Sequence, residues 1–419
     1  MNTLKFGNGE WYGKKDTILA YNDENSNFKP LPFSFDRASS ATVVNKDGLI
    51  ETVGSGEPRI DYSDDAKGAL KLEPSRTNTI TYSNDFSQSG WDNAAYPVTI
   101  TSNSIISPDG SLNANLIAPS SGNSRHAIRN LSTSAVSGTI YTLSAFVKKG
   151  GSRYIVFGDA GDSLWRVVTF DLDNGVITNE YNSSGTITAY ENGWYRITCV
   201  ITRTNSGTIQ FSLGASETSS NSGLPSFDNT SLTVYAYGCQ IESNSSYATS
   251  YIPTSGGVVT RVADVCNNGG NDQVINSTEG VLYGEVKYLS NDIGSGKYSP
   301  ISISGGTTNF VTFRHQGGVS NRLSIFIYVN NVEKFVFVTS AYNLNNYVKI
   351  AVLYSSNGSK VFINGTVAYT DTINSSFPSN TLTEVEGFQG GDYFKGNVKE
   401  IKLYNTALTD QELINLTTI

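Results

Sequence analysis

Reactive and metal-binding side chains are scarce in this chain. Its 419 residues include two histidines, His126 and His315, and three cysteines, Cys199, Cys239 and Cys266. Zinc motifs that need two histidines at short spacing are therefore excluded, and an odd, sparse set of cysteines does not make a disulfide framework. We expect all three cysteines to be reduced and to pack as small hydrophobic core or linker residues.

Long apolar runs and runs of one charge are also missing. No stretch reaches the roughly 18 apolar residues that a membrane helix needs, and the first ten residues contain no apolar signal core. Lys and Arg total 29 against 37 Asp and Glu, which gives a net charge of −8 without any basic stripe. We therefore expect no membrane insertion, no nucleic-acid binding, and synthesis in a cytoplasm without Sec export.

Short strands joined by polar turns dominate what the chain does contain. Charged residues make up only 16% of it, and the aromatic content of 11% argues against disorder. Apolar and polar residues alternate between turn residues, which is typical of antiparallel sheets with one buried face. The clearest examples are residues 141–147, 165–172 and 195–201. We expect an all-β fold of two antiparallel β-sandwich (jelly-roll) domains.

Composition divides the chain into four parts. We expect an irregular N-terminal segment that attaches to or packs against other subunits, a first sandwich, a polar linker and a second sandwich. These parts are residues 1–75, 76–258, 259–277 and 278–419, in that order. Two Gly-containing turns, Asp47-Gly48 and Asn364-Gly365, are strong hairpin signals inside the first and last parts.

One short helix is expected at the C-terminus. Thr409 is placed to cap its N-terminus, and Glu412 stands at the third helical position as the capping-box partner. Leu408 and Leu413 fit a hydrophobic staple. We expect this helix to seal an edge of the second sandwich.

A series of motifs follows the chain from residue 56 to residue 262. It includes Gly56-Glu-Pro-Arg-Ile-Asp-Tyr62, Ser107-Pro-Asp-Gly110, Asn192-Gly-Trp-Tyr-Arg196 and Ala248-Thr-Ser-Tyr-Ile-Pro253. Together these motifs resemble the carbohydrate-binding-module-like domain of bacteriophage head spikes and tail fibres. The resemblance implies a place on the virion and contact with glycans.

The last domain carries a second set of motifs. They are Lys360-Val-Phe-Ile-Asn-Gly365, a strand-like run over residues 394–404, and Ala407-Leu-Thr-Asp-Gln-Glu-Leu413. This part resembles the laminin-G/concanavalin A-like jelly roll. The resemblance implies a fold much more than a function, because this fold serves many unrelated proteins.

The two resemblances lead to a hypothesis of function. The protein would be a structural, surface-displayed virion protein (fibre, spike or capsid decoration) made in the bacterial host cytoplasm, and not an enzyme. It would bind other virion proteins, form a trimer or dimer, and adhere weakly but multivalently to host or mucosal glycans. Two alternatives stay open: a capsular polysaccharide depolymerase, and a purely structural protein that cements the capsid.

Aromatic side chains beside polar ones are the candidates for glycan contact, because a flat ring stacks on the apolar face of a sugar. In the first sandwich these candidates are Trp165, Arg166 and Tyr181. In the second they are Arg314 and His315. The alternative is that these side chains pack in the cores.

A structural calcium ion is the one cofactor that the sequence suggests. Calcium takes six to eight oxygen ligands, often from loops rich in carboxylates. Two sets of aspartates could supply them: Asp159, Asp162 and Asp171, and separately Asp61, Asp64 and Asp65. The alternative is that these carboxylates are solvated turn residues.

The run Gly161-Asp-Ser-Leu164 matches the nucleophile block of an esterase family. In such an enzyme Ser163 would attack an acyl carbon, and a histidine would take its proton. That family also needs an Asp-x-x-His partner, but the residues three positions before the two histidines are Asn123 and Thr312. We therefore expect a turn here and no catalysis.

Overall fold

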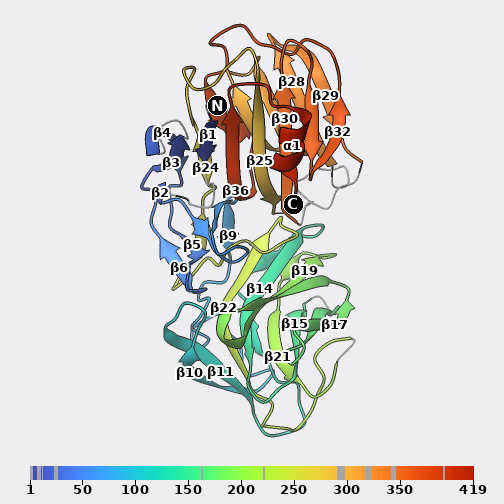
Figure 1. The fold of residues 1–419 in the computed structure, drawn as a ribbon. Coiled ribbons are helices and arrows are strands. Elements are labelled where there is room, and N and C mark those ends of the chain that lie inside the picture. Colours follow the sequence, from blue (N-terminus) through green and yellow to red (C-terminus); the bar gives the residue numbers. More distant parts are fainter. Residues whose placement is uncertain are drawn as a thin grey trace. The chain divides into compact units, whose positions relative to one another are not determined.

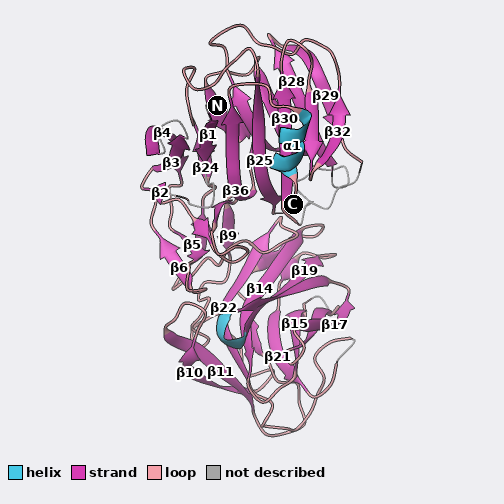
Figure 2. Cartoon of the chain, in the orientation of Figure 1, coloured by secondary structure: helices cyan, strands magenta, loops and turns pink. Residues whose placement is uncertain are grey.

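The computed structural model describes ten segments of the chain. They are residues 3–6, 11, 13–22, 27–161, 164–219, 222–289, 298–316, 322–340, 346–389 and 392–419. Strands dominate them, and a short α-helix lies near the C-terminus (Figures 1 and 2), which confirms the all-β prediction. The described residues contain no helix of the length and apolarity that crossing a membrane requires.

The chain forms two compact units. Unit 1 comprises Met1–Lys46, Val53–Pro74 and Val262–Ile419, and unit 2 comprises Asp47–Thr52 and Ser75–Arg261. The predicted turn at Asp47-Gly48 joins β5 (Ala41–Val44) to β6 (Ile50–Val53), with Gly48 at a φ of 75°. Glycine tolerates this left-handed conformation, which explains its place in the turn.

Unit 2 is an antiparallel sandwich. Its six-stranded sheet has the order β10 (Val98–Ile106), β11 (Leu112–Pro119), β22 (Val234–Ser243), β14 (Ile140–Lys149), β19 (Trp194–Thr202) and β18 (Ser184–Tyr190). Its five-stranded sheet has the order β12 (Ile128–Asn130), β21 (Phe211–Ser216), β15 (Tyr154–Asp159), β16 (Arg166–Asp171) and β17 (Val176–Tyr181). Smaller elements are the pair β13 (Ser134–Ala135) and β20 (Gly207–Thr208), the pair β9 (Arg76–Asn78) and β23 (Val259–Arg261), and the 3₁₀ turn η2 (Glu191–Gly193).

The core of unit 2 lies between these two sheets. Leu143, Ala145 and Val147 of β14 are fully buried there, as their alternation predicted. From the other sheet, Ile155 and Phe157 of β15 point into the same core. Successive strand residues point to opposite faces, so the residues between them lie on the outer faces of the sheets.

Unit 1 contains the second sandwich. Its large sheet has the order β24 (Val265–Asn267), β4 (Asn27–Asp36), β3 (Thr17–Asn22), β1 (Thr3–Phe6), β36 (Gly396–Tyr404), β25 (Gly280–Tyr288), β30 (Val348–Tyr354), β31 (Lys360–Ile363) and β32 (Thr366–Thr370). Beside this path, β2 (Gly13–Lys14) pairs with β3, and β7 (Ile60–Asp61) pairs with β8 (Ala69–Leu72), which pairs with β36.

A five-stranded sheet forms the other layer of unit 1. Its order is β29 (Val332–Val338), β28 (Arg322–Val329), β27 (Phe310–Gln316), β26 (Tyr298–Ser304) and β33 (Glu384–Glu386). Two short strands, β34 (Phe388–Gln389) and β35 (Asp392–Tyr393), pair with each other. The predicted helix is α1 (Asp410–Thr417), and its capping box of Thr409 and Glu412 is present. Leu408 and Leu413 pack with Phe362 on the large sheet.

The division into units differs from the one that composition suggested. Residues 1–75 were expected to form a segment of their own, but β1 and β8 both pair with β36, near the C-terminus of the chain. The expected linker also contains paired strands, because β23 pairs with β9 and β24 pairs with β4. A polar composition does not reveal these pairings, because backbone groups make the hydrogen bonds that hold a strand in a sheet.

Candidate glycan-binding site

Trp165 lies on the outer face of the five-stranded sheet of unit 2. It immediately precedes β16 and is half-buried. Together with Tyr96 and Tyr181 it packs against Val156 and Val167, whose side chains point away from the core between the sheets. The structure therefore brings Trp165 and Tyr181 together, as the sequence analysis expected, and adds Tyr96.

Two arginines lie over these rings. The Tyr96 and Trp165 rings are nearly parallel, with an interplanar angle of 22° and centroids 6.5 Å apart. The guanidinium carbon of Arg125 is 5.5 Å from the centroid of Trp165, and that of Arg129 is 4.5 Å from the centroid of Tyr96. We call the set of Tyr96, Trp165, Tyr181, Arg125 and Arg129 the aromatic–arginine platform.

Gly223 makes room for the Trp165 ring. Its φ is 145°, and a Cβ atom at this position would lie 2.9 Å from a carbon of the indole. Any larger residue would displace the ring. The position of Trp165 therefore depends on the segment around Gly223 as well as on its own strand.

The two arginines of the platform differ in how their charges are balanced. Arg129 forms an ion pair with Asp92 and donates a hydrogen bond to Gln210 Oε1 at 3.1 Å. Arg125 donates from Nε to the Leu224 carbonyl at 3.1 Å. It is exposed, and it has no acidic partner within the segments that the structure describes.

Arg166 does not belong to the platform, contrary to expectation. It is fully buried, donates to Thr204 Oγ1 at 2.9 Å, and lies 3.5 Å from the Asp159 carboxylate. Asp159 also pairs with Arg203 at 2.6 Å. A shift of one residue along a strand reverses the direction of the side chain, which separates Arg166 from its outward-facing neighbour Val167.

Asp159 and Asp171, two of the aspartates proposed for calcium, do not converge. In the β15–β16 pair, Asp159 lies opposite Arg166 and Asp171 lies opposite Tyr154. Five residue positions separate the two carboxylates along the strands, which is roughly 17 Å. Asp162 and Ser163 lie outside the described residues, which contain no cluster of three metal-binding side chains.

The second set of aspartates lies on unit 1, and each of its carboxylates forms an ion pair with a lysine. The three ion pairs are Asp61 with Lys71 at 2.5 Å, Asp64 with Lys287 at 2.8 Å and Asp65 with Lys399 at 2.8 Å. Each of these carboxylates therefore has a lysine ammonium group as its ion-pair partner.

The two candidates in the second sandwich lie on opposite faces of β27. Arg314 points outward, with its guanidinium carbon 4.3 Å from the centroid of Phe326. His315 points inward, is fully buried, and packs 5.5 Å from the ring of Tyr288. Burial lowers the pKa of His315 to about 4. Arg314 and His315 therefore cannot contact one ligand together.

Sequence reasoning missed two outward-facing acids on β33. Glu384 and Glu386 flank the buried Val385 and share the outer face of the five-stranded sheet. Burial, together with a smaller effect of the nearby Glu384 charge, raises the pKa of Glu386 to about 7. Neither acid has an ion-pair partner in the described part of unit 1. Their alternation in Glu384-Val-Glu386 was the available signal.

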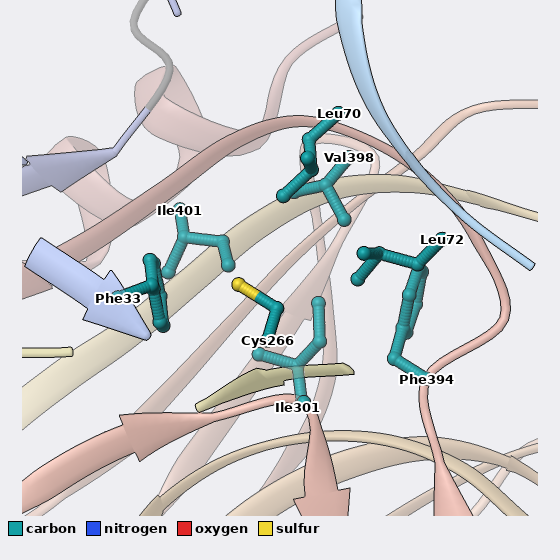
Figure 3. Close-up of a pocket in the computed structure, with 9 residues that line it drawn as sticks. Phe33, Leu70, Leu72, Cys266, Ile301, Phe394, Val398 and Ile401 are labelled. Carbon is teal, nitrogen blue, oxygen red and sulfur yellow. The ribbon is translucent and has the colours of Figure 1, made fainter. Parts of the chain in front are cut away.

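A small pocket in unit 1 has a different character (Figure 3). Apolar side chains line it, and Figure 3 shows the Cys266 thiol among them. The lining residues are Phe33, Leu70, Leu72, Cys266, Ile301, Gly387, Phe394, Val398 and Ile401. Sugar hydroxyls would find no polar partner there beyond a thiol, so this pocket is not a glycan site.

Comparison with known proteins supports the class of fold. Residues 292–414 match the family model described as the concanavalin A-like lectin/glucanases superfamily. The C-terminal part of the chain is therefore similar to laminin-G/concanavalin A-like domains, as its motifs suggested. No curated protein matches the chain.

Similar solved structures include carbohydrate-binding modules and laminin domains. The CBM40 of Ruminococcus gnavus IT-sialidase, bound to α2,3-sialyllactose, is 15% identical, with 34% of this chain and 83% of that chain covered and a TM-score of 0.28. Domain 4 of AbnA, a GH43 extracellular arabinanase from Geobacillus stearothermophilus in complex with arabinotriose, is 15% identical, with coverages of 42% and 84% and a TM-score of 0.31. Domains LG4-5 of the mouse laminin α1 chain are 10% identical, with coverages of 68% and 86% and a TM-score of 0.25.

Proposed function

We propose that this chain is a structural, surface-displayed protein of a bacteriophage virion that binds glycans through the aromatic–arginine platform. The observation that carries the glycan part is the position of Trp165, stacked beside Tyr96 and under Arg125 on an outer sheet face. Partly exposed rings offer flat apolar surface to a pyranose, and the neighbouring polar groups bond its hydroxyls. The virion part rests on the motifs over residues 56–262.

Binding without turnover fits the chemistry of this platform. Its nearest carboxylate, Asp92, is an ion-pair partner of Arg129, and this hydrogen bond holds the pKa of Asp92 below its usual range. Glycoside cleavage usually needs two carboxyl groups on either side of the scissile bond, one of them protonated. The platform is therefore suited to adhesion.

Adhesion through one shallow platform is weak. Repetition on a particle makes it useful, because linked sites can exceed the affinity of a single site by about 10²–10⁴-fold. We include homo-oligomeric display as a trimer or dimer in the proposal for this reason. Other virion proteins would anchor the chain to the particle.

One observation favours a second function, cleavage of a capsular polysaccharide. Glu384 and Glu386 occupy alternate positions of one strand, so their Cα atoms are about 7 Å apart, and their carboxyl groups can fall within the 5–10 Å that glycosidases use. Release of reducing ends from a capsule by the wild-type chain, and its loss in Glu386→Gln, would support this function.

The test of adhesion is a glycan array probed with the full chain. We expect Trp165→Ala to lose array binding while its circular dichroism shows that unit 2 stays folded at the assay temperature. The matched control is Tyr369→Ala, which removes an exposed aromatic ring from unit 1. Array binding that survives Trp165→Ala would refute glycan binding by the platform. A separate experiment, an electron-microscopy map of the particle, tests the virion location.

A further inference from the structure

We infer that the ligand of the platform is an acidic glycan, whose anionic group binds the guanidinium of Arg125. This inference rests on the proposed function and specifies its ligand. It follows from three features of Arg125: its fixed position, its uncompensated charge, and its place beside the rings.

The first feature is the position of the guanidinium. The hydrogen bond from Arg125 Nε to the Leu224 carbonyl and the contact with the Trp165 ring hold the group in one place. Both terminal nitrogens have no partner among the residues described. A planar guanidinium fixed in this way presents paired N–H donors that match a carboxylate, and little side-chain entropy remains to be lost on binding.

The second feature is the balance of charge. Arg129 is neutralised by Asp92, so it adds no net charge to the platform. The Asp228 carboxylate accepts a hydrogen bond from the Gly122 backbone N–H at 2.8 Å, and among the described residues it forms no ion pair with Arg125. The platform therefore carries one uncompensated positive charge, in a chain whose net charge is −8. That local charge favours an anionic ligand over a neutral one.

The third feature is the geometry of ring and charge. Arg125 lies over Trp165, and the Tyr96 ring lies beside the same indole. A sugar that stacks on the exposed part of the rings would bring a substituent within reach of the guanidinium. A carboxylate on the sugar, as in a uronic or sialic acid, satisfies both groups at once.

Unit 2 also supplies a natural control. Arg153 lies 4.9 Å from the centroid of Tyr154 and its side chain is 47% exposed, so it resembles Arg125 in setting. Its charge, however, is balanced by Asp171, which accepts hydrogen bonds from Arg153 Nη2 at 2.7 Å and from Arg153 Nε at 3.1 Å. Loss of Arg153 should therefore leave glycan binding unchanged.

The experiment compares acidic glycans with their neutral counterparts on one array, using the full chain. The pairs are oligogalacturonates with their methyl esters, sialylated with desialylated glycans, and sulfated with desulfated oligosaccharides. We expect wild type to prefer the carboxylated member by about tenfold, as one charge-assisted contact provides. Arg125→Ala should abolish this preference, Arg125→Lys should restore part of it, and Arg153→Ala should leave it intact.

The outcomes separate the inference from the proposed function. If wild type prefers the neutral members, or if Arg125→Ala keeps the acid preference, the inference is wrong while adhesion through Trp165 still stands. If wild type binds no glycan of either kind, both fail. A preference for sulfated over carboxylated glycans would contradict the assignment of a carboxylate as the group that binds Arg125. The ligand would then be an anionic glycan of another kind.

Discussion

The Arg59 guanidinium and the Asp264 carboxylate form a fully buried ion pair, although 205 residues separate them in the sequence. Asp264 also pairs with Arg37 at 3.0 Å, and Glu73 pairs with Arg59 at 2.6 Å. These four residues make a charge cluster inside unit 1 with two positive and two negative groups. It connects residues of the N-terminal segment to the segment that composition marked as a linker.

Removal of Asp264 tests how much unit 1 depends on this charge cluster. Asp264→Ala leaves two buried guanidinium groups with a single carboxylate, so we expect unit 1 to lose about 3–5 kcal/mol of its free energy of unfolding. Urea denaturation measures the change. The matched control is Lys360→Ala, which breaks the half-exposed Lys360–Asp410 pair and should cost less than about 1 kcal/mol. Similar losses in both variants would show that burial adds nothing.

The cap of α1 makes a second prediction. Thr409 Oγ1 accepts a hydrogen bond from the Glu412 backbone N–H at 3.3 Å, and the Glu412 carboxylate accepts one from the Thr409 N–H at 2.8 Å. Thr409→Ala should destabilise unit 1 by about 1 kcal/mol, since the Glu412 backbone N–H loses the hydroxyl that accepts its hydrogen bond. Thr409→Ser keeps the hydroxyl and should stay within a few tenths of a kcal/mol of wild type. Equal midpoints for the Ala and Ser variants in thermal unfolding would contradict the role of the cap.

Local features of the fold were readable from the sequence. The Asn364-Gly365 turn joins β31 to β32, and both residues have positive φ values of 48° and 79°, as a two-residue hairpin turn of this type requires. The capping box of α1 and the inward face of β14 were also predicted correctly. Each of these features depends on residues only a few positions apart.

Features that depend on distant partners were not readable. Nothing in the spacing of Arg59 and Asp264 indicates their contact, and nothing near β1 indicates pairing with β36. The site shows the same limit. Trp165 was proposed because tryptophan is rare in this chain, which has only four. Arg166 was grouped with it wrongly, because the exact start of β16 decides which way each side chain points.

Glu386 predicts a dependence of stability on pH. Its pKa is about 7 in the folded chain, mainly because of burial, against 4.5 for an ordinary glutamate. Between these two values the folded state keeps a proton that the unfolded state releases, so stability falls as pH rises from about 4.5 to 7. Glu386→Gln removes this cost. It should stabilise unit 1 at pH 8 by on the order of 1 kcal/mol, because the carboxyl is only partly shielded from water.

The same variant should have little effect at pH 4, where Glu386 is mostly protonated in both states. The measurement is urea denaturation of wild type and Glu386→Gln at pH 4 and pH 8. Asp272→Asn, which removes one exposed charge from unit 1, controls for the change in net charge. An equal gain at both pH values would mean that the substitution acts through packing and not through the proton.

The three cysteines make the last prediction. Cys199, Cys239 and Cys266 are free thiols and are all buried, and burial raises the pKa of each. A thiol must be exposed and ionised to attack a disulfide reagent. We therefore expect no fast reaction of the native chain with a disulfide reagent at pH 8, and three equivalents of released thiolate after unfolding in guanidinium chloride. Labelling of the native chain should proceed only as fast as the units open.

A thiol that reacts within seconds in the native chain would show that its segment is exposed in solution. The variants Cys199→Ala, Cys239→Ala and Cys266→Ala would then identify the reactive cysteine.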